Sequence, residues 1–292
     1  MTLTDGLLPT RGESLSRATA VLRAAGVEAP HVDAALLLAH SLGVDRVAIL
    51  THPETPLLPD AAARFFELVK RRAGREPLPY LTGRALFLDF SASVNRSVLI
   101  PRPETELLVE ETAARIEPDP RLIVDVGTGS GVVAIGLARR YPMARVIAID
   151  ISESALQVAR QNVRDLGVEE RVQLLHGDLL TALDLSYHYR VSVIVSNPPY
   201  IPSGDIPTLQ PEVARYEPRV ALDGGVDGRE IIQRLAAQAA DWLAPGGLLA
   251  FEVGFGQAAA AKALLRKTGY VNVDTAADLS GIERVVFGRA GS

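Results

Sequence analysis

The sequence has 292 residues, of which 48% are hydrophobic and 22% are charged. These values are typical of a globular protein with a sizeable core, and they exclude a disordered or low-complexity chain. The chain contains no cysteine, which excludes a disulfide framework, thiolate chemistry and a cysteine-based zinc site. Thirty Lys and Arg against 35 Asp and Glu give a net charge of -5, which counts mildly against stable binding of long nucleic acids.

The N-terminal segment has no basic region followed by an apolar run and a small-residue cleavage site, so we expect no signal peptide. No apolar run reaches the length of about 18 residues that a transmembrane helix needs. We therefore expect a cytoplasmic protein with no membrane partner. No metal site is expected either.

Residues 1–84 show only helical patterns and are predicted to form a small helical bundle. Ser14 is expected to cap the first helix, and Gly26 to end it. Three further helices are expected: from Pro30 to Gly43, after Asp45, and after Pro59 and Asp60.

Basic residues gather at the end of this helical segment, at Lys70, Arg71, Arg72 and Arg75. One interpretation is a solvated helix end, where cations favour the helix dipole. The other is a patch that binds a partner. The first is favoured, and the sequence leaves both open.

Residues 85–103 are predicted to form a linker that contains a short hairpin, and residues 104–292 a second domain. In the second domain apolar, β-branched runs alternate with helical patterns, which indicates a mostly parallel sheet covered by helices. Strands are expected at Leu122–Val126, Arg145–Ile149, Val172–Leu175, Val191–Val195 and Leu248–Val253. Helices are expected at Gly131–Arg140, Glu153–Leu166 and Arg229–Leu243. Two last strands, from Gly269 and from Glu283, have no helix between them, so one strand near the C-terminus should be antiparallel.

A glycine-rich loop follows the first of these strands, with the pattern Asp125-Val-Gly127-Thr128-Gly129-Ser-Gly131. Its spacing differs from the dinucleotide fingerprint, and no Lys-Ser/Thr pair follows to hold phosphates. Glycines let a ligand approach the backbone closely, and the acidic Asp125 suits a cationic ligand. The pattern resembles the S-adenosylmethionine loop of class I methyltransferases.

Acidic residues also follow the next two strands. Asp150, with Ile151 after it, is placed to accept hydrogen bonds from ribose hydroxyls. Asp178 can accept from an adenine amino group, and Leu179 can offer its backbone N–H to a ring nitrogen. A single Asp after a strand is usually a turn or cap residue. Three of them after successive strands, the first in a glycine loop, predict a nucleoside-binding site.

The fourth strand ends in Asn197-Pro198-Pro199-Tyr200. Prolines stiffen this turn, which lies where open α/β sheets bind ligands. The Asn197 side-chain oxygen and the Pro198 carbonyl can each accept one N–H of a planar NH2 group, which orients its nitrogen for attack on a methyl. Tyr200 is placed to pack against the planar group. Asn197 is expected to contact the cofactor as well.

This turn beside a methyl-donor loop indicates methylation of a planar nitrogen, which adenine N6 and glutamine methyltransferases share. A segment just upstream, Pro101-Arg102-Pro103-Glu104-Thr105-Glu106, resembles the P-R-P-E-T-E segment of the release-factor glutamine methyltransferases (the HemK/PrmC family). The resemblance covers nearly the whole chain. It extends to Pro77–Gly83, Tyr216-Glu217-Pro218, Ala221–Gly228, Glu252-Val-Gly254 and Glu283-Arg284.

The resemblance implies a Rossmann-like α/β methyltransferase domain preceded by a helical bundle that grips the protein substrate. It implies S-adenosylmethionine as cofactor and, as substrate, the glutamine in the Gly-Gly-Gln motif of peptide chain release factors. Asn197, Pro198 and Tyr200, with Pro199 between them, would hold the glutamine. The Pro101–Glu106 loop, with Arg102 and Glu104, would close over the site. Without the resemblance, Arg102 and Glu104 resemble an ordinary surface ion pair.

Three alternatives stay open on the residues alone. An N6-adenine methyltransferase acting on DNA or RNA is the first; the acidic charge and the lack of a basic, aromatic recognition region count against it. A nucleoside-binding module without catalysis is the second, although every group that the transfer needs is present. A nucleotide-dependent dehydrogenase is the third, and the glycine spacing counts against it.

Overall fold

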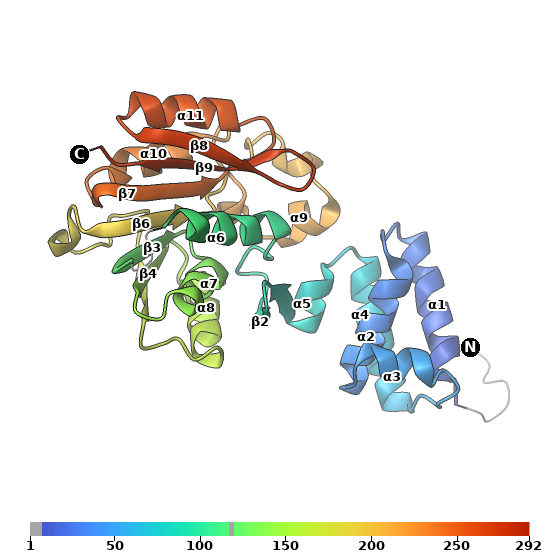
Figure 1. Cartoon of the computed structure of the whole chain (residues 1–292). Coiled ribbons are helices and arrows are strands. Elements are labelled where there is room, and N and C mark those ends of the chain that lie inside the picture. Colours follow the sequence, from blue (N-terminus) through green and yellow to red (C-terminus); the bar gives the residue numbers. More distant parts are fainter. Residues whose placement is uncertain (1–7, 117–119, 292) are drawn as a thin grey trace. The chain divides into compact units, whose positions relative to one another are not determined.

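The computed structural model describes residues 8–116 and 120–291. It divides into two compact units (Figure 1). The smaller, helical unit comprises the chain up to Gly83 together with the later segment Gln210–Tyr216, and the larger unit comprises Arg84–Leu209 and Glu217–Ser292. The contribution of Gln210–Tyr216 to the helical unit was not expected from the sequence.

Over the described residues of the helical unit, the regular secondary structure is α-helix, apart from an isolated bridge between Thr10 and Pro56. Its helices are α1 (Arg11–Ala24), α2 (Pro30–Leu42), α3 (Arg46–Thr51), α4 (Pro59–Ala73), α5 (Leu78–Thr82) and α9 (Pro211–Tyr216). They enclose a core of their own that includes Leu22, Leu37 and Phe65. The four helices predicted for this stretch are confirmed, whereas α5 was not predicted.

The first helix begins earlier than predicted. Thr10, not Ser14, is the N-cap of α1: its hydroxyl accepts from Glu13 N–H at 3.2 Å, and the Glu13 carboxylate accepts from Thr10 N–H at 2.8 Å. This reciprocal capping box satisfies two free N–H groups at once. Ser14 lies buried inside the helix instead.

The basic cluster at the end of α4 is largely neutralised within the helical unit. Arg72 is buried and donates to Asp33 at 2.7 Å and to Glu212 of α9 at 2.9 Å. Arg75 also binds Glu212, through two nitrogens at 2.6 and 2.7 Å, and Arg71 binds Glu76 at 2.8 Å. The favoured interpretation, a solvated helix end, is therefore wrong for the buried Arg72, whereas Arg71 and Arg75 remain partly exposed and bind carboxylates of the chain itself.

The larger unit begins with the predicted hairpin, β1 (Arg84–Phe87) paired antiparallel with β2 (Phe90–Ser93). Helix α6 (Pro103–Arg115) follows, where a stiff loop over Pro101–Glu106 was expected. Pro103 is the first helical residue, a position that suits proline because its missing N–H would have no partner there. Acidic residues in the first turn favour the helix dipole.

A seven-stranded sheet forms the centre of the larger unit, in the order β5-β4-β3-β6-β7-β9-β8. Its strands are β3 (Leu122–Val126), β4 (Arg145–Asp150), β5 (Val172–His176), β6 (Val191–Ser196), β7 (Leu243–Glu252), β8 (Val271–Ala277) and β9 (Glu283–Arg289). The first five are parallel, and β9 runs antiparallel to both β7 and β8. The predicted fold class is confirmed, including its one reversed strand.

Helices cover both faces of this sheet (Figure 1). One face carries α6, α7 (Val132–Arg140) and α8 (Glu153–Asp165), and the other carries α10 (Glu230–Ala239) and α11 (Ala258–Lys267). The α10 helix ends earlier than predicted, because β7 begins at Leu243. Helix α11 was not predicted.

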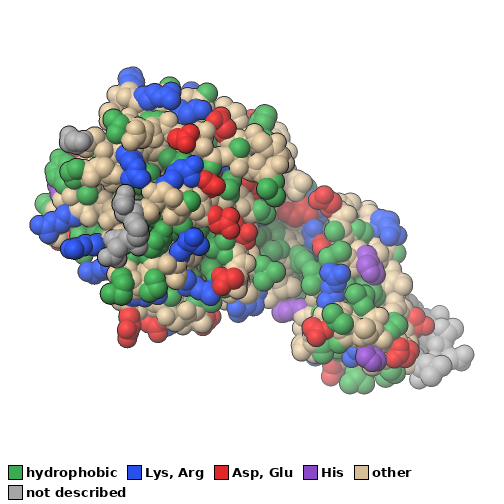
Figure 2. Space-filling view, in the orientation of Figure 1, with side chains coloured by type: hydrophobic (Ala, Val, Ile, Leu, Met, Phe, Trp, Pro, Cys, Tyr) green, Lys and Arg blue, Asp and Glu red, His purple; other side chains and the backbone are tan. Residues whose placement is uncertain are grey.

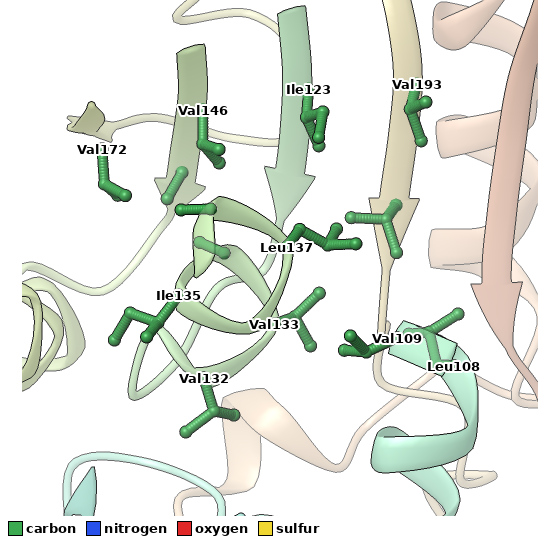
Figure 3. Packing of buried hydrophobic residues seen from close by; sticks show 14 of the residues in the cluster. Leu108, Val109, Ile123, Val132, Val133, Ile135, Leu137, Val146, Val172 and Val193 are labelled. Atoms are coloured by element: carbon green, nitrogen blue, oxygen red, sulfur yellow. The ribbon is translucent and has the colours of Figure 1, made fainter. Parts of the chain in front are cut away.

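Figure 3 shows how the first layer packs. Leu137 and Val133 of α7 lie between the sheet residues Ile123 and Val193 and the α6 residue Val109. All five are at most 4% exposed. Burial of such side chains contributes roughly 1.5–3 kcal/mol each, which holds the strand ends beside the helix that follows the glycine loop.

On the face in view, lysine and arginine side chains alternate with acidic and apolar ones (Figure 2). Among the described residues, no helix is both long enough and apolar enough to cross a membrane.

Candidate active site

The sheet reverses its strand order between β3 and β6, and a cavity of about 470 Å³ opens at that edge. Open α/β sheets bind ligands at such a switch point, where neighbouring strand ends diverge. Residues that follow four strands line the cavity: Val126, Gly127, Asp150, Ile151, Gly177, Asp178, Leu179, Asn197 and Pro199. Seven of these nine were predicted as site residues, so the structure brings them together in one place.

The glycine loop is held in shape by its neighbours. Gly127, Gly129 and Gly131 all have positive φ, between 56° and 84°, which side chains rarely tolerate. Gly129 N–H donates to Asp150 Oδ2 at 2.8 Å, which ties the loop to the end of β4. Among Gly127, Thr128, Gly129 and Gly131, only Gly127 lines the cavity.

Asp125 is buried beneath the loop, with 1% of its surface exposed, and does not line the cavity. Its Oδ2 accepts from the Thr128 hydroxyl at 2.6 Å and from Ala134 N–H at 3.1 Å. Burial raises the pKa of Asp125 to about 7, although these two hydrogen bonds lower it. The carboxyl therefore shapes the loop and the start of α7, and the direct contact with a cationic ligand that the sequence suggested is not present in the cavity wall.

Asp150 does line the cavity, at the end of β4. Its second oxygen, Oδ1, accepts from Ser152 N–H at 2.9 Å. Burial raises the pKa of Asp150, against the lowering effect of its backbone hydrogen bonds. Both oxygens are thus fixed by backbone N–H groups, and each keeps a lone pair for a ligand hydroxyl.

Asp178 and Leu179 follow β5, the neighbour of β4, and line the same cavity. The Asp178 carboxylate accepts from Arg234 of α10 at 2.5 Å, and Arg234 itself lines the cavity. Leu179 has a positive φ of 54°, an unusual conformation for a residue with a side chain. Such backbone strain gathers at binding sites, where it fixes the direction of an N–H group.

The Asn197–Tyr200 turn is held by side chains from two other elements. Asn197 Nδ2 donates to the Thr105 hydroxyl of α6 at 2.8 Å, and Thr105 donates to Glu252 Oε2 at 2.8 Å. Tyr200 donates its hydroxyl proton to the other oxygen, Oε1, at 3.0 Å. Burial raises the pKa of Glu252 to about 7, although both hydroxyl bonds lower it. Pro198 and Tyr200 flank the cavity without lining it.

A glycine-rich segment packs directly on this turn. A Cβ on Gly224 would lie 2.8 Å from Pro199 O and from Tyr200 Cα, and one on Gly228 would lie 2.3 Å from Tyr200 O. Real Cβ atoms do not approach backbone so closely, so only glycine fits here. Gln257 completes the support by donating to Tyr200 O at 2.8 Å.

Arg102 and Glu104 do not pair with each other. Arg102 donates to the buried Glu217, whose pKa burial raises and the arginine lowers. Glu104 lies 3.8 Å from Arg284 of β9. The interpretation that held without the resemblance, an ordinary surface ion pair, is therefore wrong, because the two side chains bind different partners.

Several contributors were missed from the sequence. Glu252 and Thr105 lay in quoted motifs but were given no role, since only the fold brings them to Asn197. Arg219 and Arg234 line the cavity, and nothing in their local pattern marks them. The one sequence signal that was available is Glu252 itself, a charged residue near the end of the apolar run Leu248–Val253.

Two protein families match separate segments of the chain. A family described as "PrmC N-terminal domain" matches residues 13–83, and one described as "Methyltransferase small domain" matches residues 103–209. Among solved structures, a methyltransferase from Pyrococcus furiosus aligns with a TM-score of 0.51 at 19% identity, covering 69% of this chain and 89% of its own. The 16S rRNA N2 G1207 methyltransferase of T. thermophilus, in complex with AdoMet and guanosine, also gives 0.51, at 21% identity over 71% and 49%. These likenesses show a shared fold.

Curated relatives are much more similar. A release factor glutamine methyltransferase from Geobacter sulfurreducens is 43% identical over 266 residues, which is 91% of this chain and 92% of the relative. One from Moorella thermoacetica is 44% identical over 277 residues, or 94% and 96%. Similarity of this extent spans both the helical segment and the cavity-lining residues, and the chain therefore belongs to the release factor glutamine methyltransferase family.

Proposed function

We propose that this chain transfers a methyl group from S-adenosylmethionine to the side-chain amide nitrogen of the glutamine in the Gly-Gly-Gln motif of peptide chain release factors. The observation that carries the proposal is the orientation of Asn197 at the cavity. Its Nδ2 is bonded to Thr105, and within the described residues its Oδ1 has no hydrogen-bond partner. A free acceptor at the edge of a nucleoside-sized cavity suits an incoming amide NH2.

The residues present fit the cofactor. The cavity is lined by the Asp150 carboxylate, whose two oxygens are fixed by backbone N–H groups, and by the apolar side chains of Ile151 and Leu179. Asp150 would hold the ribose hydroxyls, and Leu179 N–H and Asp178 the adenine. Gly127 gives the ligand close approach to the backbone, while Asp125, Thr128, Gly129 and Gly131 fix the loop. When bound, S-adenosylmethionine supplies an electrophilic methyl on a sulfonium.

The chain's own part in the chemistry is to hold the nucleophile. An amide nitrogen is a poor nucleophile because its lone pair is delocalised. The Asn197 oxygen and the Pro198 carbonyl would each accept one N–H, which orients the nitrogen in line with the methyl and favours a pyramidal geometry. Fixed acceptors also stabilise the positive charge that develops on the nitrogen during transfer, so no strong base is required before attack.

Tyr200 would pack its ring against the planar amide. Its hydroxyl is bonded to the buried Glu252, and burial raises its pKa above the ordinary value, so it stays neutral. The ring is thus a fixed, uncharged wall. The substrate nitrogen loses its proton after methylation begins, when that proton has become acidic, to water or a nearby carbonyl.

The remaining parts concern the protein partner. The helical unit would dock the release factor, and the α6 start, with Arg102 and Glu104, would lie over the substrate. Its substrates act in translation, so we place the enzyme in the cytoplasm. We expect no stable complex of the enzyme with nucleic acid.

The test is incubation with labelled S-adenosylmethionine and either purified release factor or DNA. We expect label on the Gly-Gly-Gln glutamine, located by mass spectrometry of the tryptic peptide. A release factor in which that glutamine is replaced by alanine is the matched control and should take up none. Label in DNA with none on the glutamine would overturn the proposal.

A further inference from the structure

We propose that Thr105 and Glu252 are positioning residues that fix which end of the Asn197 amide faces the substrate. The inference rests on the proposed function and deepens it. It adds a hydrogen-bond relay with one permitted direction, from Asn197 through Thr105 to Glu252.

The direction follows from counting protons. Above its pKa of about 7 Glu252 is ionised and only accepts hydrogen bonds, and a threonine hydroxyl has one proton. Thr105 gives that proton to Glu252 at 2.8 Å, so toward Asn197 it can only accept. Asn197 must then present Nδ2 to Thr105, at 2.8 Å, and turn Oδ1 away from it. The acceptor that the substrate amide needs is thereby selected over the competing donor.

The same carboxylate fixes the second substrate contact. Glu252 Oε1 accepts from Tyr200 at 3.0 Å, so both of its oxygens are used by residues of one site. Glu252 is 1% exposed and Thr105 3% exposed, which leaves no room for bulk water to replace either bond. Glu104 and Arg284, the charged groups nearby, act on Glu252 in opposite directions. A buried carboxylate is costly unless its bonds are made, and here they converge on the catalytic turn.

The consequence of losing the relay is specific. Without an acceptor at Thr105, the Asn197 amide can rotate and present NH2 to the substrate NH2, donor against donor. Cofactor binding would not change, because neither Thr105 nor Glu252 lines the cavity. Loss of orientation should therefore lower kcat rather than cofactor affinity.

The first experiment compares three variants in full-length protein. Thr105→Val removes the hydroxyl at equal size, and we expect kcat to fall on the order of 100-fold while the Kd for S-adenosylmethionine changes by less than about twofold. Thr105→Ser keeps the hydroxyl and should retain most activity. Thr112→Val is the matched control: Thr112 lies on the same helix, fully buried, and its hydroxyl has no hydrogen-bond partner in the described structure. It should leave kcat unchanged.

A second experiment reads the relay without using activity. The chain has four asparagines, so ¹⁵N-asparagine labelling gives four side-chain amide signals, and Asn197→Ala assigns the one of interest. We expect its amide protons to be protected from exchange in the wild type and in Thr105→Ser, and unprotected in Thr105→Val. Glu252→Gln should also alter this signal, because the new NH2 group can donate to the Thr105 or the Tyr200 hydroxyl and so reverse the direction of that hydrogen bond.

These results separate the two proposals. A wild-type enzyme that leaves the release-factor glutamine unmodified refutes the proposed function, and the amide signal still tests the relay. An active wild type with equal kcat in Thr105→Val refutes the relay, as does an Asn197 amide equally protected in both proteins. A Thr105→Ser variant as impaired as Thr105→Val would also overturn it, because the hydroxyl would then not be the group that matters.

Discussion

The side-chain amide of Asn162 makes two hydrogen bonds with the backbone of Ser93: Ser93 N–H donates to Asn162 Oδ1 at 2.7 Å, and Asn162 Nδ2 donates to Ser93 O at 2.9 Å. The same Nδ2 group also donates to Ser130 O, in the glycine loop, at 2.8 Å. One buried side chain of α8 therefore joins the β2 hairpin to the loop.

Asn162→Ala should destabilise the protein by about 3 kcal/mol, because it leaves backbone groups of the half-buried Ser93 and the buried Ser130 without these partners. We expect a lower midpoint in chemical unfolding and weaker cofactor binding through the loosened loop. Gln161→Ala, at an exposed site next to it on the same helix, is the control. Equal midpoints for the two variants would show that the bonds contribute no net stability.

Asn197→Ala should abolish methyl transfer while cofactor affinity stays nearly intact. Removal of one fixed group that stabilises developing charge costs roughly 100- to 1,000-fold in rate. Single-turnover rates and calorimetric cofactor binding check the two halves of the prediction. The exposed Asn95→Ala serves as control. A parallel loss of cofactor affinity would instead assign Asn197 a structural role.

Gly224→Ala should displace the catalytic turn. The new Cβ would lie 2.8 Å from backbone atoms of Pro199 and Tyr200, which cannot yield as a flexible side chain would. We expect kcat to fall on the order of 100-fold, together with a lower melting temperature. Gly204→Ala is matched, since Gly204 also has ordinary φ and no atom of the described chain within 4 Å of its Cβ position. Normal activity in Gly224→Ala would mean that the turn tolerates the shift.

Asp125 makes the protein's stability depend on pH. Its pKa is raised by burial from 3.8 to about 7, and the charge of nearby Asp150 adds to the rise. Between these values the folded state binds more protons than the unfolded chain, so this group's contribution is present at low pH and is lost as pH approaches about 7.

Asp125→Asn should remove that dependence. The asparagine oxygen can still accept from Thr128 and Ala134, and the side chain does not titrate. We expect the melting temperature of the variant, relative to wild type, to rise between about pH 4 and pH 7 and then level off. Calorimetry at a series of pH values measures this difference. A difference that stays constant with pH would show that the carboxyl is ionised throughout.

Local patterns predicted those elements whose ends carry strong signals. Leu122–Val126 is β3 residue for residue, because a β-branched run meets a glycine at its end. Gly43 ends α2 as expected, in the left-handed conformation that glycine favours. The start of α6 was missed although Pro103 marks it, since two prolines around Arg102 also suit a stiff loop.

The candidate site was predictable as far as it follows strand ends. Parallel strands bring Asp150, Asp178 and Asn197 to one edge whatever the details of packing. Contacts between helices and the sheet were not predictable. Nothing in the local pattern indicates that Thr105 will bind Glu252, which lies 147 residues later in the chain. The partner of the arginine cluster could not be predicted for the same reason, because Glu212 belongs to a segment far away in the sequence.

That distant segment has a consequence for how the protein can be divided. Helix α9 brings Glu212 to Arg72 and Arg75, and Tyr216 donates to Gly74 O at 2.7 Å, so the helical unit is assembled from two pieces of chain. A fragment that stops at Gly83 would leave Arg75 without a carboxylate and Arg72 with Asp33 alone, and the complementary fragment would carry α9 without the helices it binds. A self-sufficient excised version would need residues 210–216 appended through a designed connector.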